Sequence, residues 1–455
     1  MNDHVGQFIH SLRFEDLPDA VIEQAQYCLL DLLGVAAAGS NTQLAQIACD
    51  HAADFFGAGS MRTRLLFDGR IASPLGAALA GAMTIDSFDG HDGHSLTKGH
   101  VGVAVLPALL AMAELDPSMD GRSFLTSLVL GYEIGTRAGI ALHATSSEYH
   151  TSGAWNALAA AAVIARGLKL DSERTRHALG IAEYHGPRSD MMRCIDFPTM
   201  LKDGSGWGCM AGVSAALLAE RHFTGAPALT VEAHDEGALW SDLGQRWFIL
   251  DQYFKPFPVC RWAHPAIACA LRLRETEVFV ADAIQSVEIE TFHEATRLCA
   301  SVPVTTEEAQ YGVLFPVAAA LLDGRVDAET IGPTGLAEAR LRYLIPRLSL
   351  RDSASFSALF PAQRWARVIV HTRDGRMLDS GPMQSQGDPE RPLPRDALRA
   401  KFRAFADARI GQDRAAAMER EVFNLTEPAH ALSPLLDLVL SVPETSPAEA
   451  IRSVL

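Results

Sequence analysis

The chain has 455 residues, of which 48% are hydrophobic, and its formal net charge is −16 at pH 7. This composition predicts a folded protein with a sizeable core and two or three domains, and it excludes a disordered chain. The acidic balance and the lack of any Lys/Arg-rich run argue against nucleic acid and anionic membranes as partners, but not against a small anionic substrate.

We expect no membrane anchor and a reducing, cytoplasmic location. No stretch reaches 18 uninterrupted apolar residues, which is the length that a transmembrane helix needs. The first residues, MNDHVGQFIHSLRFEDL, lack the basic and apolar regions of a signal peptide. The seven cysteines include no CxxC pair, which indicates reduced thiols. We interpret Cys209 and Cys260 as structural, because neither has a Cys-His protease context.

The first 250 residues predict a series of helices. Apolar residues recur at helical spacing, Gly39 ends one of these helices and Pro74 begins the next. These segments are rich in Ala and Gly, so the helix axes are expected to approach closely. The predicted helices cover residues 18–38, 74–86, 105–115, 124–142, 153–168 and 209–222.

The pattern changes in the last part of the chain. Residues 283–295 contain the alternation V-E-I-E, which is typical of a half-buried strand. Residues 365–382 predict a β-hairpin with its turn at Asp374-Gly375, and a helix is predicted at 315–324 between these strands.

Helical patterns return from Pro394 onward. The sequence therefore predicts a mainly α protein, in which a smaller α+β domain is inserted near the C-terminus of a large all-α helical domain. The helical domain would comprise residues 1–262 and 395–455, and the inserted domain residues 263–394.

The segment at 84–104, TIDSFDGHDGHSLTKGHVGVA, concentrates titratable groups between two predicted helices. Its glycines break helical and strand patterns, so it is predicted to be a loop, where functional groups often gather. It contains Asp86, Asp89, His91, Asp92, His94, Lys98 and His100. Three interpretations remain open: a solvated loop that caps helix ends, a metal site using His91, His94 and the aspartates, and acid–base chemistry without a metal. The spacing matches no zinc or calcium signature, which favours the last.

Two further clusters precede predicted helices. His150 lies just before a helix start whose free N–H groups suit a carboxylate, although Ser152 could simply cap that helix. Lys202 and Asp203 lead into a glycine-rich turn, GSGWG, which could cradle an anion or merely need a positive φ. No Walker pattern is present, so nucleotide binding is disfavoured.

A fourth cluster, YFKPFPVCRWAHPAIACA, lies at the predicted domain junction. It brings together Lys255, Arg261 and His264. Arg261 could stack on an aromatic ring or bind a carboxylate, and junctions between domains favour small-molecule clefts.

Several blocks, in order along the chain, resemble one family. They include IDSFDGHDGHSLTKGHVGVAVLPALLAMAE, LVLGYEIGTRAG, EYHTSGAWNALAAAA and FKPFPVCRWAHPAI. Together they resemble the MmgE/PrpD family, which includes 2-methylcitrate dehydratase, cis-aconitate decarboxylase and iminodisuccinate epimerase. The resemblance covers nearly the whole chain and implies a helical domain, an α+β lid, an active site between them, a homodimer, and catalysis without a metal or organic cofactor.

The resemblance also implies a set of site residues. By its motifs, catalytic roles fall on Asp86, His100, His150, Lys202 and His264, and Asp89 is placed among the substrate-binding residues. From the residues themselves, we also assign substrate binding to His91, Thr97, Lys98 and Arg261. The chain departs from the family pattern at several points. His91, His94 and Lys98 are additions, a valine follows His100 where proline is usual, the match of Lys202 needs a shift of one residue, and Phe315 stands where some members have a tyrosine.

We therefore predict a cofactor-independent hydro-lyase that acts on a small hydroxy di- or tricarboxylate similar to 2-methylcitrate. His100 or His150 would remove the proton next to a carboxylate, and Asp86 would orient a histidine or act as an acid. The substrate carboxylates would be held by Lys98, Lys202, Arg261 and His264. Epimerisation or decarboxylation of a related polycarboxylate is the alternative. A metal-dependent hydrolase using Asp86, His91 and His94, and a non-catalytic carboxylate binder, are more remote.

Overall fold

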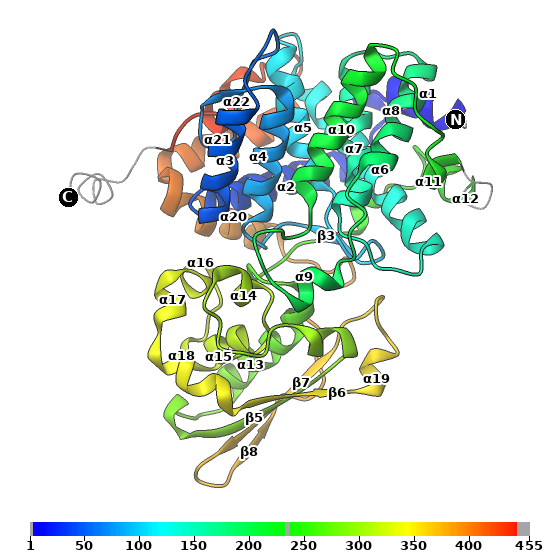
Figure 1. Cartoon of the computed structure of the whole chain (residues 1–455). Coiled ribbons are helices and arrows are strands. Elements are labelled where there is room, and N and C mark those ends of the chain that lie inside the picture. The colour runs from blue at the N-terminus through cyan, green and yellow to red at the C-terminus, as the bar shows by residue number, and fades with distance from the viewer. Residues whose placement is uncertain (1–2, 233–236, 444–455) are drawn as a thin grey trace.

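The computed structural model describes residues 3–232 and 237–443 of the chain and has two lobes (Figure 1). One lobe is mostly helical and contains both the first and the last helices, while the smaller lobe contains a sheet covered by short helices. The protein is thus mainly α with a small mixed sheet in its C-terminal region, as predicted. The predicted domain boundaries fall just before α13 (His264–Thr276) and just before α20 (Arg395–Ile410).

The helical lobe is built on long helices rich in alanine and glycine. Its helices are α1 (Asp3–Ser11), α2 (Asp19–Gly39), α3 (Gln43–Phe55), α4 (Pro74–Asp86), α5 (Gly102–Leu115), α6 (Gly121–Thr145), α7 (Gly153–Gly167), α8 (Ser172–His185), α10 (Ser205–Glu220), α11 (Leu229–Glu232), α12 (Gly237–Trp240), α20, α21 (Gln412–Asn424) and α22 (Ser433–Val439). Helix α9 (Met192–Asp196) lies near the junction of the lobes, and β1 (Thr63–Arg64) pairs with β2 (Ile71–Ala72).

Small residues explain the close packing of α10 on α7 and α4. A Cβ on Gly212 would lie 2.2 Å from the carbonyl oxygen of Ala157, and one on Gly206 would lie 2.5 Å from Met83. Helix α10 begins at Ser205, four residues earlier than predicted, so most of the predicted glycine-rich turn is its first turn. Tertiary burial overrides the low helix propensity of glycine there.

Helix α2 is the one helix in the described ranges that is long and apolar enough to cross a membrane. However, 83% of its apolar window is buried inside the protein, which is typical of a core helix. It packs against α20, so the first and last parts of the described chain contact each other within the helical lobe.

The smaller lobe contains a four-stranded sheet in the order β6-β5-β7-β8. Strand β5 (Ile284–Thr291) runs parallel to β6 (Leu348–Asp352) and antiparallel to β7 (Ala366–Thr372), which forms the predicted hairpin with β8 (Met377–Asp379). Helix α13 packs on β7 and on α15 (Leu314–Asp323), the helix predicted at 315–324. The remaining short helices are α14 (Thr306–Gln310), α16 (Ala328–Ile331), α17 (Pro333–Ala337), α18 (Ala339–Leu344) and α19 (Ala354–Ser357).

The loop between α4 and α5, which carries several of the predicted site residues, is buried. His91 and Asp92 are each 0% exposed, which excludes the solvated-loop interpretation. Within the loop, β3 (Gly93–His94) pairs with β4 (Gln252–Tyr253), the strand that leads to the junction between the lobes. The α4–α5 loop is therefore held against the junction by backbone hydrogen bonds.

Candidate active site

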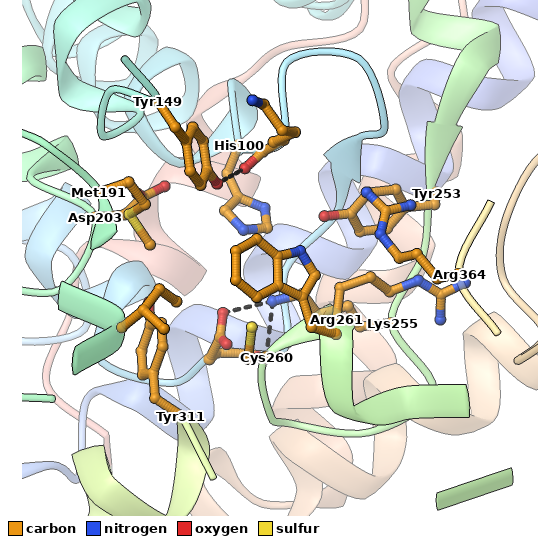
Figure 2. Close-up of a pocket in the computed structure, with 14 residues that line it drawn as sticks. His100, Tyr149, Met191, Asp203, Tyr253, Lys255, Cys260, Arg261, Tyr311 and Arg364 are labelled. Carbon is orange, nitrogen blue, oxygen red and sulfur yellow. Dashed lines mark hydrogen bonds and ion pairs between the residues drawn. The ribbon is translucent and has the colours of Figure 1, made fainter. Parts of the chain in front are cut away.

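A small enclosed cavity lies where the two lobes meet (Figure 2). Its volume is about 30 Å³, and a larger, more open hollow of about 380 Å³ shares Lys98, Tyr149 and Trp262 with it. The cavity is lined by Asp89, Lys98, His100, Tyr149, Met191, Ile195, Asp203, Tyr253, Lys255, Cys260, Arg261, Trp262, Tyr311 and Arg364. Since the enclosed volume holds little more than water, a polycarboxylate needs side chains or lobes to move apart on binding.

Four of the predicted site residues line this cavity: Asp89, Lys98, His100 and Arg261. Asp89 forms a buried ion pair with Lys255, with 2.5 Å between Asp89 Oδ1 and Lys255 Nζ. Burial alone would raise the pKa of Asp89, but the ammonium groups of Lys255 and Lys202 outweigh burial and hold that pKa well below its ordinary value. Asp89 is therefore an anion that neutralises part of the cationic wall.

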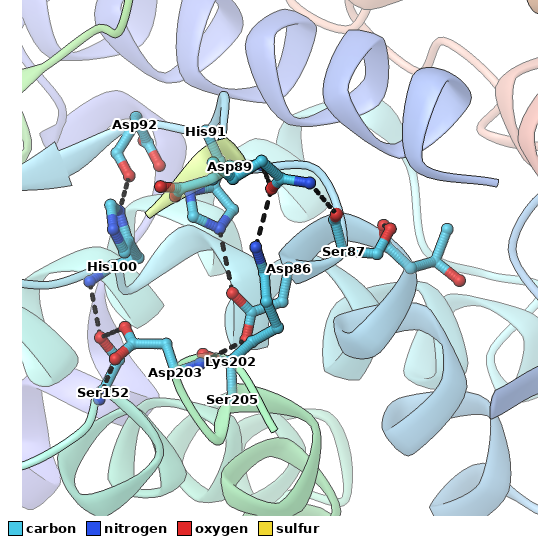
Figure 3. Close-up of polar contacts among 12 residues, drawn as sticks. Asp86, Ser87, Asp89, His91, Asp92, His100, Ser152, Lys202, Asp203 and Ser205 are labelled. Carbon is cyan, nitrogen blue, oxygen red and sulfur yellow. Dashed lines mark hydrogen bonds and ion pairs between the residues drawn. The ribbon is translucent and has the colours of Figure 1, made fainter. Parts of the chain in front are cut away.

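Three predicted residues lie directly behind the wall. His91 Nε2 lies 3.5 Å from Asp86 Oδ1, and the ring of His91 lies 4.2 Å from that of His100 (Figure 3). The ammonium of Lys202 donates a hydrogen bond of 2.7 Å to Gln310 Oε1. Asp86, His91 and Lys202 thus support groups at the cavity without lining it.

The remaining predicted residues, His150, His264 and Thr97, do not line the cavity. His264 Nε2 donates to the carbonyl oxygen of Val259 (2.9 Å), and its Nδ1 accepts from Arg261 Nη1 (3.1 Å). Burial, with the nearby Arg261 charge, lowers the pKa of His264 well below its ordinary value. His264 is therefore a neutral support for Arg261.

His150 and Thr97 make local contacts. His150 Nδ1 lies 3.0 Å from the carbonyl oxygen of Glu148, and the backbone N–H of His150 donates to His143 Nε2 (3.2 Å). The Thr97 hydroxyl donates to the carbonyl oxygen of His94 (3.1 Å), which stabilises the turn that carries Lys98. In this conformation neither side chain belongs to the cavity wall.

His100 is held from both sides. Its Nδ1 lies 2.5 Å from the backbone carbonyl oxygen of Asp92, and its backbone N–H donates to Ser152 Oγ (2.9 Å). A carbonyl oxygen only accepts, so Nδ1 carries the proton and Nε2 keeps the lone pair. Burial, the neighbouring His91 and Lys255 lower the pKa of His100 well below its ordinary value. Near neutral pH His100 is therefore an uncharged base.

Asp203 lies on the other side of Ser152. The Ser152 hydroxyl donates to Asp203 Oδ2, and the Ser152 backbone N–H donates to Oδ1 (3.2 Å) (Figure 3). Burial, together with the neighbouring Asp86 carboxylate, raises the pKa of Asp203 above its ordinary value. The Ser152 oxygen thus joins His100 to a carboxyl group that tends to stay protonated.

A second layer of buried polar groups holds the α4–α5 loop from beneath. The Tyr132 hydroxyl donates to Asp92 Oδ2, and burial with the nearby Asp31 raises the pKa of Asp92 to about 7. Lys401, on α20, donates to Asp31 Oδ1 (2.5 Å) and to the carbonyl oxygen of Gly90 (2.6 Å). The helix that returns from the end of the chain thereby supports the loop that carries His100.

The loop also requires glycines and tolerates strain. A Cβ on Gly93 would lie 2.7 Å from His100 Nδ1, and one on Gly99 would lie 2.3 Å from Ser152 Oγ. Lys98 and Lys202 have positive φ angles of 51° and 49°, which are uncommon for residues with a side chain. Such strain concentrates at functional sites, where surrounding contacts impose it.

The metal-binding interpretation fits these contacts poorly. In the described ranges, the ligand atoms that gather within 4.8 Å belong to Asp89, His91 and His100, a different set from the Asp86, His91 and His94 proposed from the sequence. The Lys255 ammonium already neutralises Asp89, and a second cation there would face its repulsion. The geometry favours acid–base chemistry by the side chains themselves.

Comparison with known protein families shows to which family the chain belongs. Residues 3–241 match the MmgE/PrpD N-terminal domain, and residues 257–426 match the MmgE/PrpD C-terminal domain. The chain belongs to the MmgE/PrpD family. Residues 242–256, which include β4 and Lys255, lie between the two matches, and residues of both matched ranges line the cavity.

Curated relatives in this family carry related names. The chain is 26% identical to the cis-aconitate decarboxylase of Homo sapiens, over 92% of this chain and 90% of the relative. It is 24% identical to the cis-aconitate decarboxylase-like protein oryM of Aspergillus oryzae, over 95% of both chains. It is 22% identical to the cis-aconitate decarboxylase of Aspergillus terreus, over 98% and 97%. These alignments span nearly the full MmgE/PrpD architecture.

Several cavity residues of this MmgE/PrpD protein were not assigned to the site from the sequence. Tyr149, Asp203 and Lys255 lie in clusters that the sequence singled out, but Tyr311 and Arg364 lie in segments without a motif. Cys260 lines the cavity, and burial raises the pKa of its thiol to about 12. It is therefore protonated at neutral pH, which agrees with its interpretation as a structural cysteine.

Proposed function

We propose that the protein is a cofactor-independent lyase that acts on a small polycarboxylate by proton transfer at a carbon near a carboxylate. The observation that carries this proposal is that His100 and Asp203 line one cavity, where the Ser152 hydroxyl holds both residues: it accepts from the His100 backbone N–H and donates to the Asp203 carboxyl group. Their surroundings shift the two pKa values in opposite directions, so that a neutral base and a protonated acid coexist near pH 7.

The cations around this pair suit a substrate with several carboxylates. Lys255 and Arg261 line the cavity, and Lys202 lies directly behind its wall. Removing a proton next to a carboxylate, or losing carbon dioxide, places negative charge on the substrate. Fixed cations in a site that excludes water stabilise that charge in the transition state.

The relatives support decarboxylation of a cis-aconitate-like acid as the reaction. In that reaction the C–C bond to one carboxylate breaks and carbon dioxide leaves. The bonding electron pair forms a new C=C bond, and the electrons of the old one take up a proton at its far carbon. The protonated Asp203 supplies this proton and is reprotonated from solvent.

Dehydration of a hydroxy acid is the second candidate, and the presence of a base and an acid favours it. His100 Nε2 would take a proton from the carbon next to a carboxylate, and Asp203 would donate its proton to the hydroxyl group on the neighbouring carbon. The C–O bond breaks, water leaves, and a C=C bond forms. The same two side chains serve both reactions, so the substrate decides between them.

A direct comparison of two substrates tests the proposal. The purified protein is incubated with cis-aconitate and, separately, with 2-methylcitrate in deuterated water. Release of carbon dioxide, formation of an alkene and deuterium at carbon are then measured. We expect carbon dioxide release and one carbon-bound deuterium from cis-aconitate. Alkene formation from 2-methylcitrate alone would assign a dehydratase, and the absence of all three signals with both acids would overturn the proposal.

We also propose that the protein works as a cytoplasmic homodimer. The exposed apolar side chains of Phe197 (72% exposed), Leu201 (76%) and Trp207 (45%) border a common hollow of about 300 Å³. Grouped apolar side chains of this kind are typical of an interface. Sedimentation analysis of the wild type and of Leu201→Glu tests this, with a monomeric wild type as the contradicting result.

A further inference from the structure

Arg364 is a buried cation that forms no ion pair within the described residues. It lies two residues before β7 in the smaller lobe and is only 4% exposed. Its Nη1 donates one hydrogen bond to Ser95 Oγ (3.1 Å), while its buried Nε has no partner among the described residues. A guanidinium group has five N–H donors, so one neutral hydroxyl leaves most of its binding capacity unused.

The other buried cations of the described residues show how unusual this is. Arg137, Lys255, Arg261 and Lys401 are each buried, and each forms an ion pair with a carboxylate. Lys202 donates to the amide oxygen of Gln310 and has the Asp89 charge nearby. An unpaired charge removed from water is costly, so a buried guanidinium without a carboxylate indicates a place for an anion from outside the chain.

Lys98 provides a second cation at the cavity that Arg364 lines. It lines the cavity and the larger hollow, and its ammonium lies 4.4 Å from the centre of the Tyr149 ring. It forms no ion pair within the described residues, although the Glu294 charge is felt from a distance. Lys98 and Arg364 both line the cavity, so the two cations face a common region. Burial lowers the pKa of Lys98, and repulsion from Arg364 adds to that effect.

The two cations come from different lobes. Arg364 belongs to the sheet lobe, and Figure 2 shows it beside Tyr253 and Arg261 at the edge of the cavity. Lys98 belongs to the α4–α5 loop of the helical lobe, the same loop that carries Ser95 and His100. An anion held between Lys98 and Arg364 would therefore bridge the lobes at the mouth of the cavity.

We propose that Arg364, together with Lys98, binds a second carboxylate of the substrate, remote from the carbon at which His100 acts, and so selects polycarboxylates over monocarboxylates. This inference rests on the proposed polycarboxylate substrate. The planar guanidinium matches a carboxylate with two parallel hydrogen bonds, which gives direction as well as affinity. The reacting carboxylate would instead be held by Lys255, which lines the same cavity and whose charge acts on His100.

Ligand-induced thermal stabilisation and equilibrium binding test this without requiring turnover. The probes are cis-aconitate, maleate and crotonate, which carry three, two and one carboxylates. We expect the wild type to bind cis-aconitate and maleate at least about tenfold more tightly than crotonate, as expected for one charge-assisted bidentate contact. In Arg364→Met this preference should fall to less than about threefold, while the affinity for crotonate stays within twofold.

Two features separate a binding role from a structural one. Without ligand, Arg364→Met should melt at the same temperature as the wild type or higher, because it removes an unpaired buried charge. Arg364→Lys, which keeps the charge but not the fork geometry, should retain part of the preference. The matched control is Arg367→Gln in the same lobe. Arg367 pairs with Asp379 at the surface, so this substitution should leave the preference for polycarboxylates unchanged.

The outcomes also separate this inference from the proposed function. If Arg364→Met keeps the full preference for polycarboxylates, or if the wild type shows none, the inference is wrong. If the wild type shows the preference and the variant loses it, but neither carbon dioxide nor water is released from any acid, the inference stands and the proposed reaction fails.

Discussion

His100 Nδ1 lies 2.5 Å from the backbone carbonyl oxygen of Asp92. This contact leaves the lone pair on Nε2 and, with the lowered pKa of His100, keeps the ring an uncharged base at neutral pH. The contact joins two residues of one loop, and burial of that loop beneath the cavity makes it chemically useful.

Removing this base should cost most of the activity. We expect His100→Gln to lower kcat/KM on the best polycarboxylate by about 10²–10⁴-fold, because general base catalysis contributes about that much. Steady-state kinetics and circular dichroism check the loss and the fold. The matched control, His185→Gln, changes an exposed histidine at the end of α8 and should keep the wild-type rate. Activity of His100→Gln within threefold of the wild type would remove His100 from the mechanism.

Asp203 should set the alkaline limb of the pH–rate profile. Burial and Asp86 raise its pKa, so it remains protonated to a higher pH than an ordinary aspartate and loses its proton as the pH rises further. We expect the rate to fall with rising pH through this raised pKa. Asp203→Asn, which has no proton of that kind to donate, should lower kcat at every pH and remove the limb. An unchanged profile in the variant would assign the limb to another group.

Asp92 should make stability depend on pH in a direction opposite to that of an ordinary ion-paired carboxylate. Its folded-state pKa is raised to about 7, whereas an unfolded aspartate has a pKa near 3.8. The folded state thus binds the extra proton, and the stabilisation is complete below pH 3.8 and is lost as the pH rises through about 7. Relative to the wild type, Asp92→Asn should therefore gain free energy of unfolding between about pH 4 and 7 and then level off.

Denaturant unfolding of both proteins across this range measures that difference, and subtraction cancels the other titrating groups. The kinetic constants at pH 7 should change little, because the backbone carbonyl of residue 92, and not its side chain, holds His100. A flat difference between pH 4 and 7 would show that Asp92 is ionised in the folded protein.

Lys401 should link the end of the chain to the catalytic loop. Lys401→Met removes the partner of the buried Asp31 carboxylate and the hydrogen bond to the Gly90 carbonyl. We expect a loss of about 3–5 kcal/mol in the free energy of unfolding, since one buried charge is left unpaired. The double variant Asp31→Leu/Lys401→Met should recover most of this stability but not the activity, because the Gly90 carbonyl of the loop still lacks its hydrogen bond from residue 401. Equal activity in the double variant and the wild type would contradict a role for Lys401 in holding the loop.

Gly99 should not tolerate even one methyl group. Its Cβ would lie 2.3 Å from Ser152 Oγ, the atom that joins His100 to Asp203. We expect Gly99→Ala to lower kcat by at least about tenfold, through displacement of that oxygen. Gly57→Ala is the matched control, because no atom lies within 4 Å of its added Cβ. Equal rates for the two variants would show that the loop adjusts freely.

Local sequence patterns predicted most of the helical lobe. Helix α4 has the predicted bounds, because Pro74 suits its first turn and the Ser73 hydroxyl accepts the Gly76 N–H. Helix α10 was predicted to begin too late, since only its contacts with α7 and α4 make a glycine-rich first turn helical. Where local propensity and packing agree, the sequence is sufficient; where they conflict, packing prevails.

The sequence by itself determined the family, the two kinds of lobe and the position of the polar α4–α5 loop, because each depends on residues that are contiguous in the chain. Of the predicted site residues, Asp89, Lys98, His100 and Arg261 line the cavity. Only the tertiary structure decided that His264 supports Arg261, and that Tyr311 and Arg364 join the cavity. Such contacts depend on how distant segments pack and on which charges burial leaves without a partner, and neither property can be read from neighbouring residues.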